Sequence, residues 1–302
     1  TAQKDGNMAE YFHVNDAEAN LALIPDGVSD EAACYTTDMM STGFKGAENA
    51  RIPLGGSGVV FGMGPVGLMA IAGTRLLGAG LVIAVDCVPS RLELARQYGA
   101  DVVINFKEQD PIAEIMRLTR GHGADAAMDA LGSQATFENC VKVTRAGGVI
   151  SNIGYFGHGD TINIPRAEWG VGMGEKTITT LLCPGGSERM GRLMRLIESG
   201  RVDPTRLTTH HFQFSEIEKA LDMMTTKADG IIKPVIHFGW SADALIQRGR
   251  MRRHDGLPCG RAGHAAAAHP ETGTSMNITL HAPLCAGAAL LACLSPLAAA
   301  EG

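Results

Sequence analysis

A short glycine-rich stretch constrains this chain more than any other feature. An apolar run at residues 59–61 ends in a Gly-x-Gly-x-x-Gly pattern at 62–67, and a helical apolar pattern starts directly after it. A second apolar run, at 81–85, follows about 20 residues after the pattern begins and ends in Asp86. This order of strand, turn, helix, strand and acid predicts a unit that binds a dinucleotide.

Each glycine in that turn has a physical task. Gly62 permits the tight turn, Gly64 lets backbone approach a pyrophosphate, and Gly67 lets the helix pack close to the strand. Pro65 and Val66 begin the helix, whose free N–H groups and partial positive charge favour phosphate groups. We therefore expect these five residues to bind the cofactor.

Asp86 extends the prediction from the pyrophosphate to the adenosine ribose. Its carboxylate is expected to accept hydrogen bonds from the ribose hydroxyls. A methyltransferase is the main alternative for such a turn, but it usually carries an acidic residue just before the first glycine. This chain has Phe61 there, which favours the dinucleotide interpretation.

Composition limits the classes of partner. The chain has 302 residues, enough for about two domains. Its formal net charge of −6 and pI of about 5.9 do not suggest a nucleic acid or an anionic membrane as partner. The seven cysteines contain no Cys-x-x-Cys pair, and their odd number fits a reducing cytoplasm. No signal sequence or membrane-spanning run is evident, and the first residue is Thr1, so we expect the natural start to lie upstream.

A strand–helix alternation predicts the fold. Apolar strands are expected at 58–62, 81–86, 102–105, 125–130, 148–153 and 177–182, with helices at 66–78, 89–98, 111–119 and 135–143 between them. Such an alternation predicts an α/β fold with a doubly wound, parallel, six-stranded sheet covered on both faces. Its ligands lie beyond the carboxyl ends of the strands. Two further strands are expected near the start, at 9–14 and 20–25.

The chain is expected to divide into four parts. Residues 41–182 form the dinucleotide-binding domain, while 1–40 and 183–240 belong together in a smaller domain. Residues 241–302 are expected to be appended by a lost stop codon or a frameshift, because 276–300 have the layout of a secretory signal peptide at the wrong end of a chain. A natural C-terminal extension that docks as an apolar helix remains the alternative.

With these features in place, the chain resembles the zinc-dependent medium-chain alcohol dehydrogenases, and most closely the bacterial secondary-alcohol dehydrogenase branch. The resemblance covers about residues 5–240. The matching segments are 6–14, 36–44, 62–69, 147–152, 165–170 and 182–186. The resemblance implies a Rossmann domain, the remnant of a GroES-like catalytic domain, and a homo-oligomer, often a tetramer.

The resemblance also implies a chemistry. A catalytic Zn²⁺ binds the oxygen of a small secondary alcohol, ketone or aldehyde, and a hydride passes between that substrate and the nicotinamide. The family holds this zinc with Cys, His and Asp, and the Asp corresponds to Asp38. The Cys and His ligands are expected upstream of Thr1, so we expect a weak or absent zinc site. Alone, Asp38 would be read as a helix-surface acid.

Further site residues follow from the same resemblance. Leu182 and Cys183 correspond to positions beside the substrate, although Cys183 is equally well read as a small buried residue. Tyr155 and Lys233 correspond to positions near the cofactor, although Lys233 otherwise reads as a solvated lysine in an edge strand.

Asp86 also bears on the choice of cofactor. Members of the branch that use NADP carry Gly-Ser-Arg where this chain has Asp-Cys-Val at 86–88. A carboxylate there repels a 2′-phosphate, so NAD is predicted over NADP, with an incomplete preference because Arg91 can approach the ribose. The predicted function is a zinc-dependent alcohol dehydrogenase. The alternatives are a zinc-free oxidoreductase resembling quinone reductases and a non-catalytic fragment that binds NAD.

Overall fold

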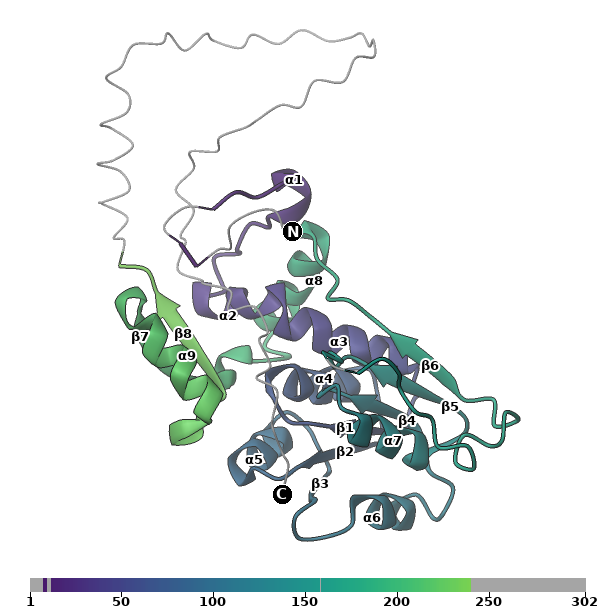
Figure 1. Cartoon of the computed structure of the whole chain (residues 1–302). Helices are drawn as coiled ribbons and strands as arrows, with labels where there is room; N and C mark the ends of the chain where they lie inside the picture. Colours follow the sequence, from purple (N-terminus) through teal and green to yellow (C-terminus); the bar gives the residue numbers. More distant parts are fainter. Residues whose placement is uncertain (1–7, 10–11, 158, 240–302) are drawn as a thin grey trace, which may run out of the picture.

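The computed structural model describes residues 8–9, 12–157 and 159–239. Its main element is a parallel six-stranded sheet in the order β3-β2-β1-β4-β5-β6 (Figure 1), which confirms the predicted doubly wound fold. The strand order reverses between β1 and β4, where the chain crosses from one half of the sheet to the other. The strands are β1 (Ser57–Phe61), β2 (Leu81–Asp86), β3 (Val102–Asn105), β4 (Ala124–Asp129), β5 (Thr144–Asn152) and β6 (Thr177–Thr180).

Helices cover both faces of this sheet. On one face, α3, α4 and α5 share a core with side chains of β1 and β2; on the other, α6 and α7 pack against the opposite side chains of the same strands. Alternate strand residues therefore enter two different cores, as period-two side-chain geometry requires. The bounds are α3 (Met39–Ala50), α4 (Pro65–Leu76), α5 (Pro89–Gln97), α6 (Pro111–Leu118) and α7 (Gln134–Val143).

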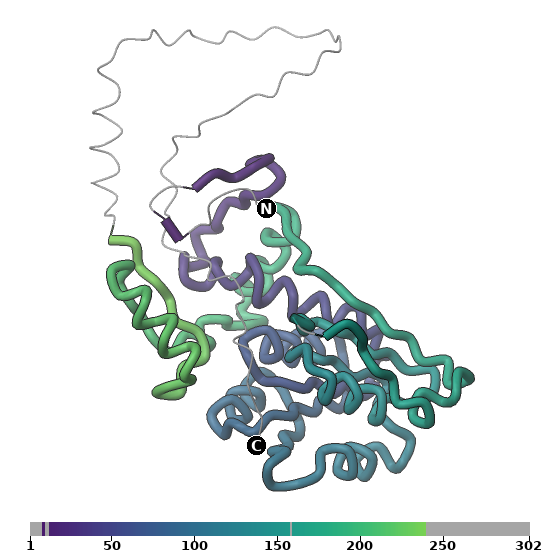
Figure 2. Tube along the Cα trace, in the orientation of Figure 1, coloured from purple at the N-terminus to yellow at the C-terminus, as the bar shows by residue number. Residues whose placement is uncertain are grey.

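The remaining elements come from the two ends of the described chain. The second sheet is a parallel pair, β7 (Thr208–Gln213) and β8 (Lys233–His237), connected through α9 (Ile217–Thr226). The tube in Figure 2 shows the first and last described segments on the same side of the large domain. The other elements are α1 (Ala17–Asn20), α2 (Asp30–Cys34), η1 (Tyr35–Thr37), α8 (Ser187–Glu198), η2 (Pro204–Leu207), η3 (Phe214–Glu216) and η4 (Ala228–Gly230).

Specific contacts join those two segments. The hydroxyls of Tyr35 and Thr208 are 2.6 Å apart, and Thr208 also donates a hydrogen bond to the Glu31 carboxylate. The side chain of Met194 on α8 packs with Val28, Ala32 and Ala33 in a small core of its own. Residues far apart in sequence therefore build one unit beside the large sheet.

Some expected elements differ in the structure. The strands predicted at 9–14 and 20–25 are wrong over their described parts, since residues 12–14 and 21–25 form no strand. A strand needs a neighbour for its backbone hydrogen bonds, and no described strand pairs with these segments. β5 begins earlier than predicted because Thr144 pairs with Ala124 ahead of a register shift. Residues 241–302 lie outside the described part, and within that part no helix has the length and apolar character to cross a membrane.

Candidate cofactor and substrate site

The glycine-rich turn follows β1 and leads directly into α4. Gly62 has a φ of +92°, a conformation that favours glycine, and its N–H donates to Val85 O on β2. A Cβ on Gly67 would lie 1.8 Å from Gly62 O, so only glycine lets α4 approach the strand this closely. A Cβ on Gly64 would meet no atom within 4 Å. The turn is thus closely packed at Gly67 and open to solvent space at Gly64.

The start of α4 is suited to a phosphate group. Gly64 is the N-cap residue and supplies no side-chain cap, and Pro65 occupies the first turn. Leu68 is the first residue of this helix whose backbone N–H donates to the carbonyl of the N-cap residue, Gly64 O. The N–H groups of Val66 and Gly67 precede it at the positive end of the helix dipole, where an anion is stabilised.

Asp86 lies at the end of β2 beside this turn, as predicted, and it has a second task that the sequence did not reveal. Its Oδ2 accepts a hydrogen bond of 2.6 Å from Met63 N, and its Oδ1 accepts from Cys87 N and Val88 N at 2.7 and 2.9 Å. The buried carboxylate therefore fixes the glycine-rich turn against the end of β2. Arg91 follows in the first turn of α5, where its N–H donates to Val88 O.

The loops after β4 and β5 form the neighbouring part of the same edge. Asp129 and Asn152 are directly paired at the ends of these strands. The Asp129 Oδ1 accepts from the N–H groups of Leu131 and Gly132, both at 3.0 Å, and thereby shapes the loop after β4. Burial raises the pKa of the Asp129 carboxyl, while those two backbone N–H groups lower it in part. Tyr155 follows β5 and is 80% exposed at this edge.

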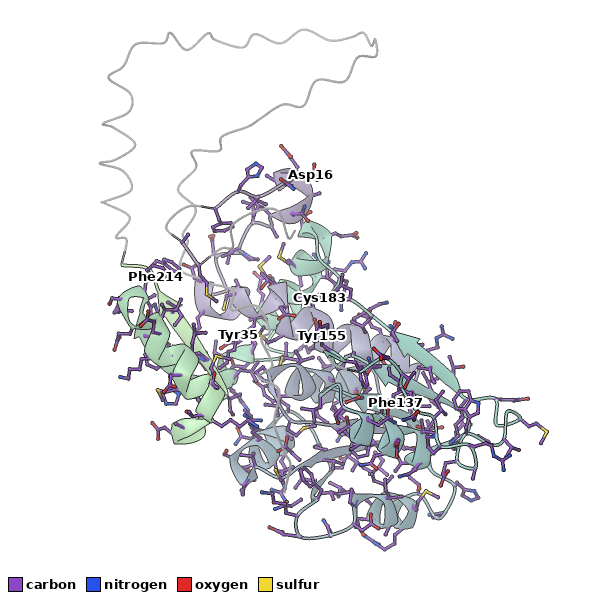
Figure 3. The ribbon with its side chains drawn as sticks, in the orientation of Figure 1. Asp16, Tyr35, Phe137, Tyr155, Cys183 and Phe214 are labelled. Carbon is purple, nitrogen blue, oxygen red and sulfur yellow. The ribbon has the colours of Figure 1, made fainter. Side chains whose placement is uncertain are left out.

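Asp38 and Cys183 meet although they are distant in sequence. Asp38 directly precedes α3, and its Oδ1 accepts a hydrogen bond of 2.9 Å from Thr42 Oγ1. The Cys183 thiol lies 3.5 Å from Thr37 O, beside the start of α3 (Figure 3). Burial, and to a smaller extent the Asp38 carboxylate, raise the pKa of Cys183, so its thiol is protonated at neutral pH. Leu182, just before it, is 91% exposed.

Lys233 is buried, unlike a lysine on the surface of an edge strand. It begins β8, is 7% exposed, and its charge acts on Cys34 of α2. Burial raises the pKa of that thiol to about 12 despite the opposing effect of Lys233. The alternative interpretation of Lys233 as a solvated lysine is therefore wrong.

The donor side chains of the described residues decide whether this part of the chain can hold a metal ion. Over residues 8–9, 12–157 and 159–239, no group of three or more His, Cys, Asp and Glu side chains is close enough to hold a metal ion. Asp38 has Cys183 beside it, but no third donor of these types among the described residues completes a set. The described donors therefore do not fit a zinc ion, whereas the turn at 62–67 does fit a dinucleotide.

Comparisons with known proteins agree with this geometry. The sequence model of the zinc-binding dehydrogenases matches residues 65–199. An alcohol dehydrogenase of Cupriavidus necator is 49% identical over 232 residues, which are 77% of this chain and 63% of that protein. The NADP-dependent isopropanol dehydrogenase of Clostridium beijerinckii is 47% identical over 234 residues, 77% of this chain and 67% of that protein.

A solved structure shows the same arrangement. The zinc-dependent alcohol dehydrogenase 2 of Streptococcus pneumonia superposes with a TM-score of 0.70 at 32% identity, over 78% of this chain and 67% of the other. In the sequence comparison, the chain spans less than two thirds of the length of the C. necator alcohol dehydrogenase. Together, the fold, the turn at 62–67 and these identities show that the chain belongs to the zinc-dependent medium-chain alcohol dehydrogenase family.

Proposed function

We propose that this chain contributes to an alcohol dehydrogenase that transfers a hydride between a small secondary alcohol and a nicotinamide cofactor. The observation that carries the proposal is the glycine-rich turn, which Asp86 fixes through Met63 N at the start of α4. The turn leaves open space at Gly64, and the start of α4 offers backbone N–H groups without intrahelical partners. A pyrophosphate requires this arrangement.

The cofactor would extend from this turn along the carboxyl ends of the strands. Gly62, Gly64, Pro65, Val66 and Gly67 hold the pyrophosphate. Asp86 and Arg91 face the adenosine ribose on the β2 side, and Tyr155 faces the nicotinamide side after β5. Lys233 acts near the cofactor from β8. The nicotinamide ring supplies the hydride-transfer chemistry when bound, and the chain's own residues position it.

The substrate would lie near the start of α3. Asp38 is the proposed catalytic residue. The family resemblance would also make it a metal ligand, although the described donors alone do not fit a zinc ion. Leu182 and Cys183 would contact the substrate from the segment after β6. The name of the C. beijerinckii relative specifies isopropanol, which supports a small secondary alcohol as substrate. The protonated, partly buried Cys183 thiol offers an apolar surface to such a molecule rather than a charge.

The choice between NAD and NADP has two opposing indications. A carboxylate at Asp86 is expected to repel a 2′-phosphate, which favours NAD, whereas the C. beijerinckii relative is named NADP-dependent. We infer a preference for NAD from this chain's own residue. The carboxylate already accepts three backbone N–H groups, so it is held in place against an approaching phosphate.

Fluorescence titration of the chain with NADH and NADPH tests both statements. We expect NADH to bind more tightly, and D86G to narrow the difference by reducing repulsion of the phosphate. D86N removes the charge and keeps one of the two acceptor oxygens, so it retains either the Met63 N contact or the Cys87 N and Val88 N contacts, and it is a control for partial loss of the turn contacts. Tighter NADPH binding by the unchanged chain would contradict the NAD preference, and binding of neither would contradict the cofactor site.

Isopropanol oxidation with a parallel zinc analysis tests the chemistry. Zinc with turnover would support a zinc-dependent dehydrogenase, and D38N would then abolish both, whereas the described donors alone do not fit a zinc ion. NADH binding without zinc or turnover would limit this chain to cofactor binding. Turnover without zinc would contradict the zinc-dependent mechanism.

The proposal extends to domain organisation, oligomeric state and cellular location. We propose residues 41–182 as the dinucleotide-binding domain, 1–40 and 183–240 as parts of the catalytic domain, and a cytoplasmic homotetramer. The contact between Tyr35 and Thr208 supports the grouping of the two outer segments. The described cysteines are free thiols, which fits a reducing compartment. Light scattering tests the tetramer, since a monomeric mass would contradict it.

A further inference from the structure

Asp129 is a buried carboxyl at the end of β4 that lies outside the residues proposed to hold the cofactor. Its side chain is fully buried, and its Oδ2 has no hydrogen-bond partner within the described residues. A buried carboxyl with an unpaired oxygen lowers the stability of a fold. Its position in the sheet indicates a role in ligand binding instead, because β4 lies next to β1 where the strand order reverses.

Asp129 holds both of the loops that follow β4 and β5. Its Oδ1 accepts hydrogen bonds of 3.0 Å from the N–H groups of Leu131 and Gly132. Its backbone carbonyl accepts two more, from Ile153 N at 2.9 Å and from Gly154 N at 2.8 Å. One residue therefore ties two neighbouring loops to the end of a single strand.

The two loops are packed too closely to move independently. A Cβ on Gly132 would lie 2.4 Å from Tyr155 O, and a Cβ on Gly154 would lie 2.1 Å from Gly132 N. Asn152, at the end of β5, donates from Nδ2 to Gly154 O at 3.0 Å and so fixes the second loop from its own strand. A displacement of the loop after β4 must therefore displace the loop after β5 as well.

The loop after β4 also contacts the glycine-rich turn. Ala130 N donates to Phe61 O at 2.9 Å, and a Cβ on Gly67 would lie 3.3 Å from the Ala130 Cβ. In the proposed cofactor site, this turn holds the pyrophosphate and Asp86 lies on the adenosine side, at the end of β2. The nicotinamide half of the dinucleotide must then extend to the other side of the turn, over the loops that Asp129 holds.

From these contacts we propose that Asp129 is a positioning residue for the nicotinamide half of the cofactor. Its carboxyl fixes the N–H groups of Leu131 and Gly132, so that the loops after β4 and β5 present one rigid surface to the nicotinamide ring. The inference rests on the proposed cofactor site and assigns the residue that shapes its nicotinamide end. Asp129 acts through the loops, because its own side chain is fully buried.

Isothermal titration calorimetry with NADH and with ADP-ribose tests the proposal, because ADP-ribose has the adenosine and the pyrophosphate but lacks the nicotinamide ring. The unchanged chain should bind NADH more tightly than ADP-ribose. D129A is expected to weaken NADH binding about tenfold and ADP-ribose binding less than about twofold, since two N–H groups lose their acceptor at the nicotinamide end alone.

Two further variants separate this role from a general loss of structure. D129N keeps one acceptor oxygen for Leu131 N and Gly132 N, so it should restore most of the NADH affinity. N152A removes the donor to Gly154 O and should also weaken NADH more than ADP-ribose, through the second loop. It tests the same surface without changing Asp129.

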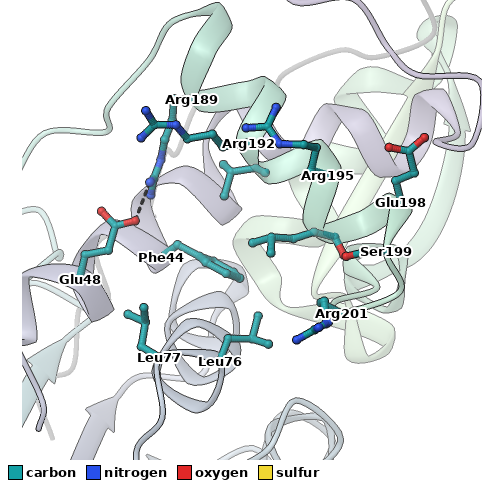
Figure 4. Close-up of a pocket in the computed structure, with 12 residues that line it drawn as sticks. Phe44, Glu48, Leu76, Leu77, Arg189, Arg192, Arg195, Glu198, Ser199 and Arg201 are labelled. Atoms are coloured by element: carbon teal, nitrogen blue, oxygen red, sulfur yellow. Dashed lines mark hydrogen bonds and ion pairs between the residues drawn. The ribbon is translucent and has the colours of Figure 1, made fainter. Parts of the chain in front are cut away.

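The matched control is R189A, which is also expected to lower stability but acts elsewhere. Arg189 pairs with Glu48 near the end of α4 opposite to the glycine-rich turn (Figure 4), so its loss should leave the ratio of the two affinities unchanged. Melting temperatures of all variants establish that each is folded.

The outcomes separate the role of Asp129 from the cofactor site itself. Equal losses of NADH and ADP-ribose affinity in D129A and N152A, or an equally selective loss in R189A, would overturn the role of Asp129 and leave the cofactor site in place. D129N binding NADH as weakly as D129A would likewise overturn it. Binding of neither ligand by the unchanged chain would contradict the cofactor site as well.

Discussion

At the scale of the residue, two glycines of the same turn have opposite surroundings. Gly67 faces the backbone of Gly62 and has no room for a side chain, whereas Gly64 faces open space. The sequence pattern predicts that Gly67 serves helix packing and that Gly64 serves the ligand. The structure shows close packing at Gly67 and open space at Gly64.

The variants G64A and G67A should therefore separate folding from binding. G64A is expected to keep or slightly raise stability, because its φ of −71° suits alanine, while its new methyl group enters the space of the pyrophosphate and weakens NADH binding. G67A forces backbone apart and should cost about 1–3 kcal/mol of stability as well as cofactor binding. Chemical denaturation and NADH fluorescence measure the two effects. NADH bound normally by G64A would contradict the proposed position of the pyrophosphate.

Asp129 is a second residue whose environment makes a prediction. It is fully buried, and its Oδ2 has no hydrogen-bond partner within the described residues. Burial raises its pKa in the folded state, so folding favours the protonated form. The contribution of the protonated Asp129 carboxyl to folding stability is fully present below the pKa of about 3.9 in the unfolded chain. It is lost as the pH rises through the raised pKa of the folded state.

Replacing Asp129 tests the predicted direction of the pH dependence of stability. D129N keeps an acceptor for Leu131 N and Gly132 N but cannot ionise, so its stability relative to the unchanged protein should increase as the pH rises above about 4. D129A removes the acceptor and should cost about 1–3 kcal/mol for each N–H left unsatisfied. Urea unfolding across a pH series measures both. If the difference in free energy of unfolding between D129N and the unchanged protein did not vary with pH, the pKa of Asp129 would be the same in the folded and unfolded states.

At the scale of the element, α8 is joined to α3 by Arg189. Its guanidinium donates to Glu48 Oε1 at 2.6 Å and to Ser41 O at 3.1 Å, and its side chain is 15% exposed. A partly buried cation with several acceptors contributes more than a surface ion pair. This contact connects the segment after β6 to the helix that begins beside Asp38.

Removing Arg189 should therefore cost more than removing a surface arginine. R189A is expected to lower the free energy of unfolding by about 1–3 kcal/mol, since it leaves acceptors of α3 unpaired. R96A, which breaks the exposed pair of Arg96 with Glu93, should change it by less than about 0.5 kcal/mol. Thermal and denaturant unfolding compare the two variants. Equal effects would show that α8 does not depend on this contact.

At the scale of the whole molecule, folding of this chain is expected to be independent of metal. The described residues bring Asp38 to Cys183 but assemble no group of three donors. A structural zinc site would contribute binding free energy to folding, and a chelator would remove that contribution. The dinucleotide fold here relies instead on two apolar cores, one on each face of the sheet.

A chelator should therefore leave the melting temperature of this chain unchanged, while saturating NADH should raise it. At 100 times its Kd, a ligand that binds only the folded state adds about 2.7 kcal/mol. Differential scanning fluorimetry with a chelator, with added zinc and with NADH gives the comparison. A fall of several degrees with the chelator would indicate a metal bound to the folded chain.

Local sequence determined the large domain. Strand runs, helix starts and the Gly-x-Gly-x-x-Gly pattern depend on neighbours along the chain, so the six-stranded sheet and the turn at 62–67 were predicted nearly in place. The two early strands were not, because a strand exists only with a partner. Only the tertiary structure decided the surroundings of Asp86, Asp129 and Lys233, and it brought Cys183 to Asp38. Burial, acceptor geometry and pKa depend on atoms that folding brings together from distant parts of the sequence.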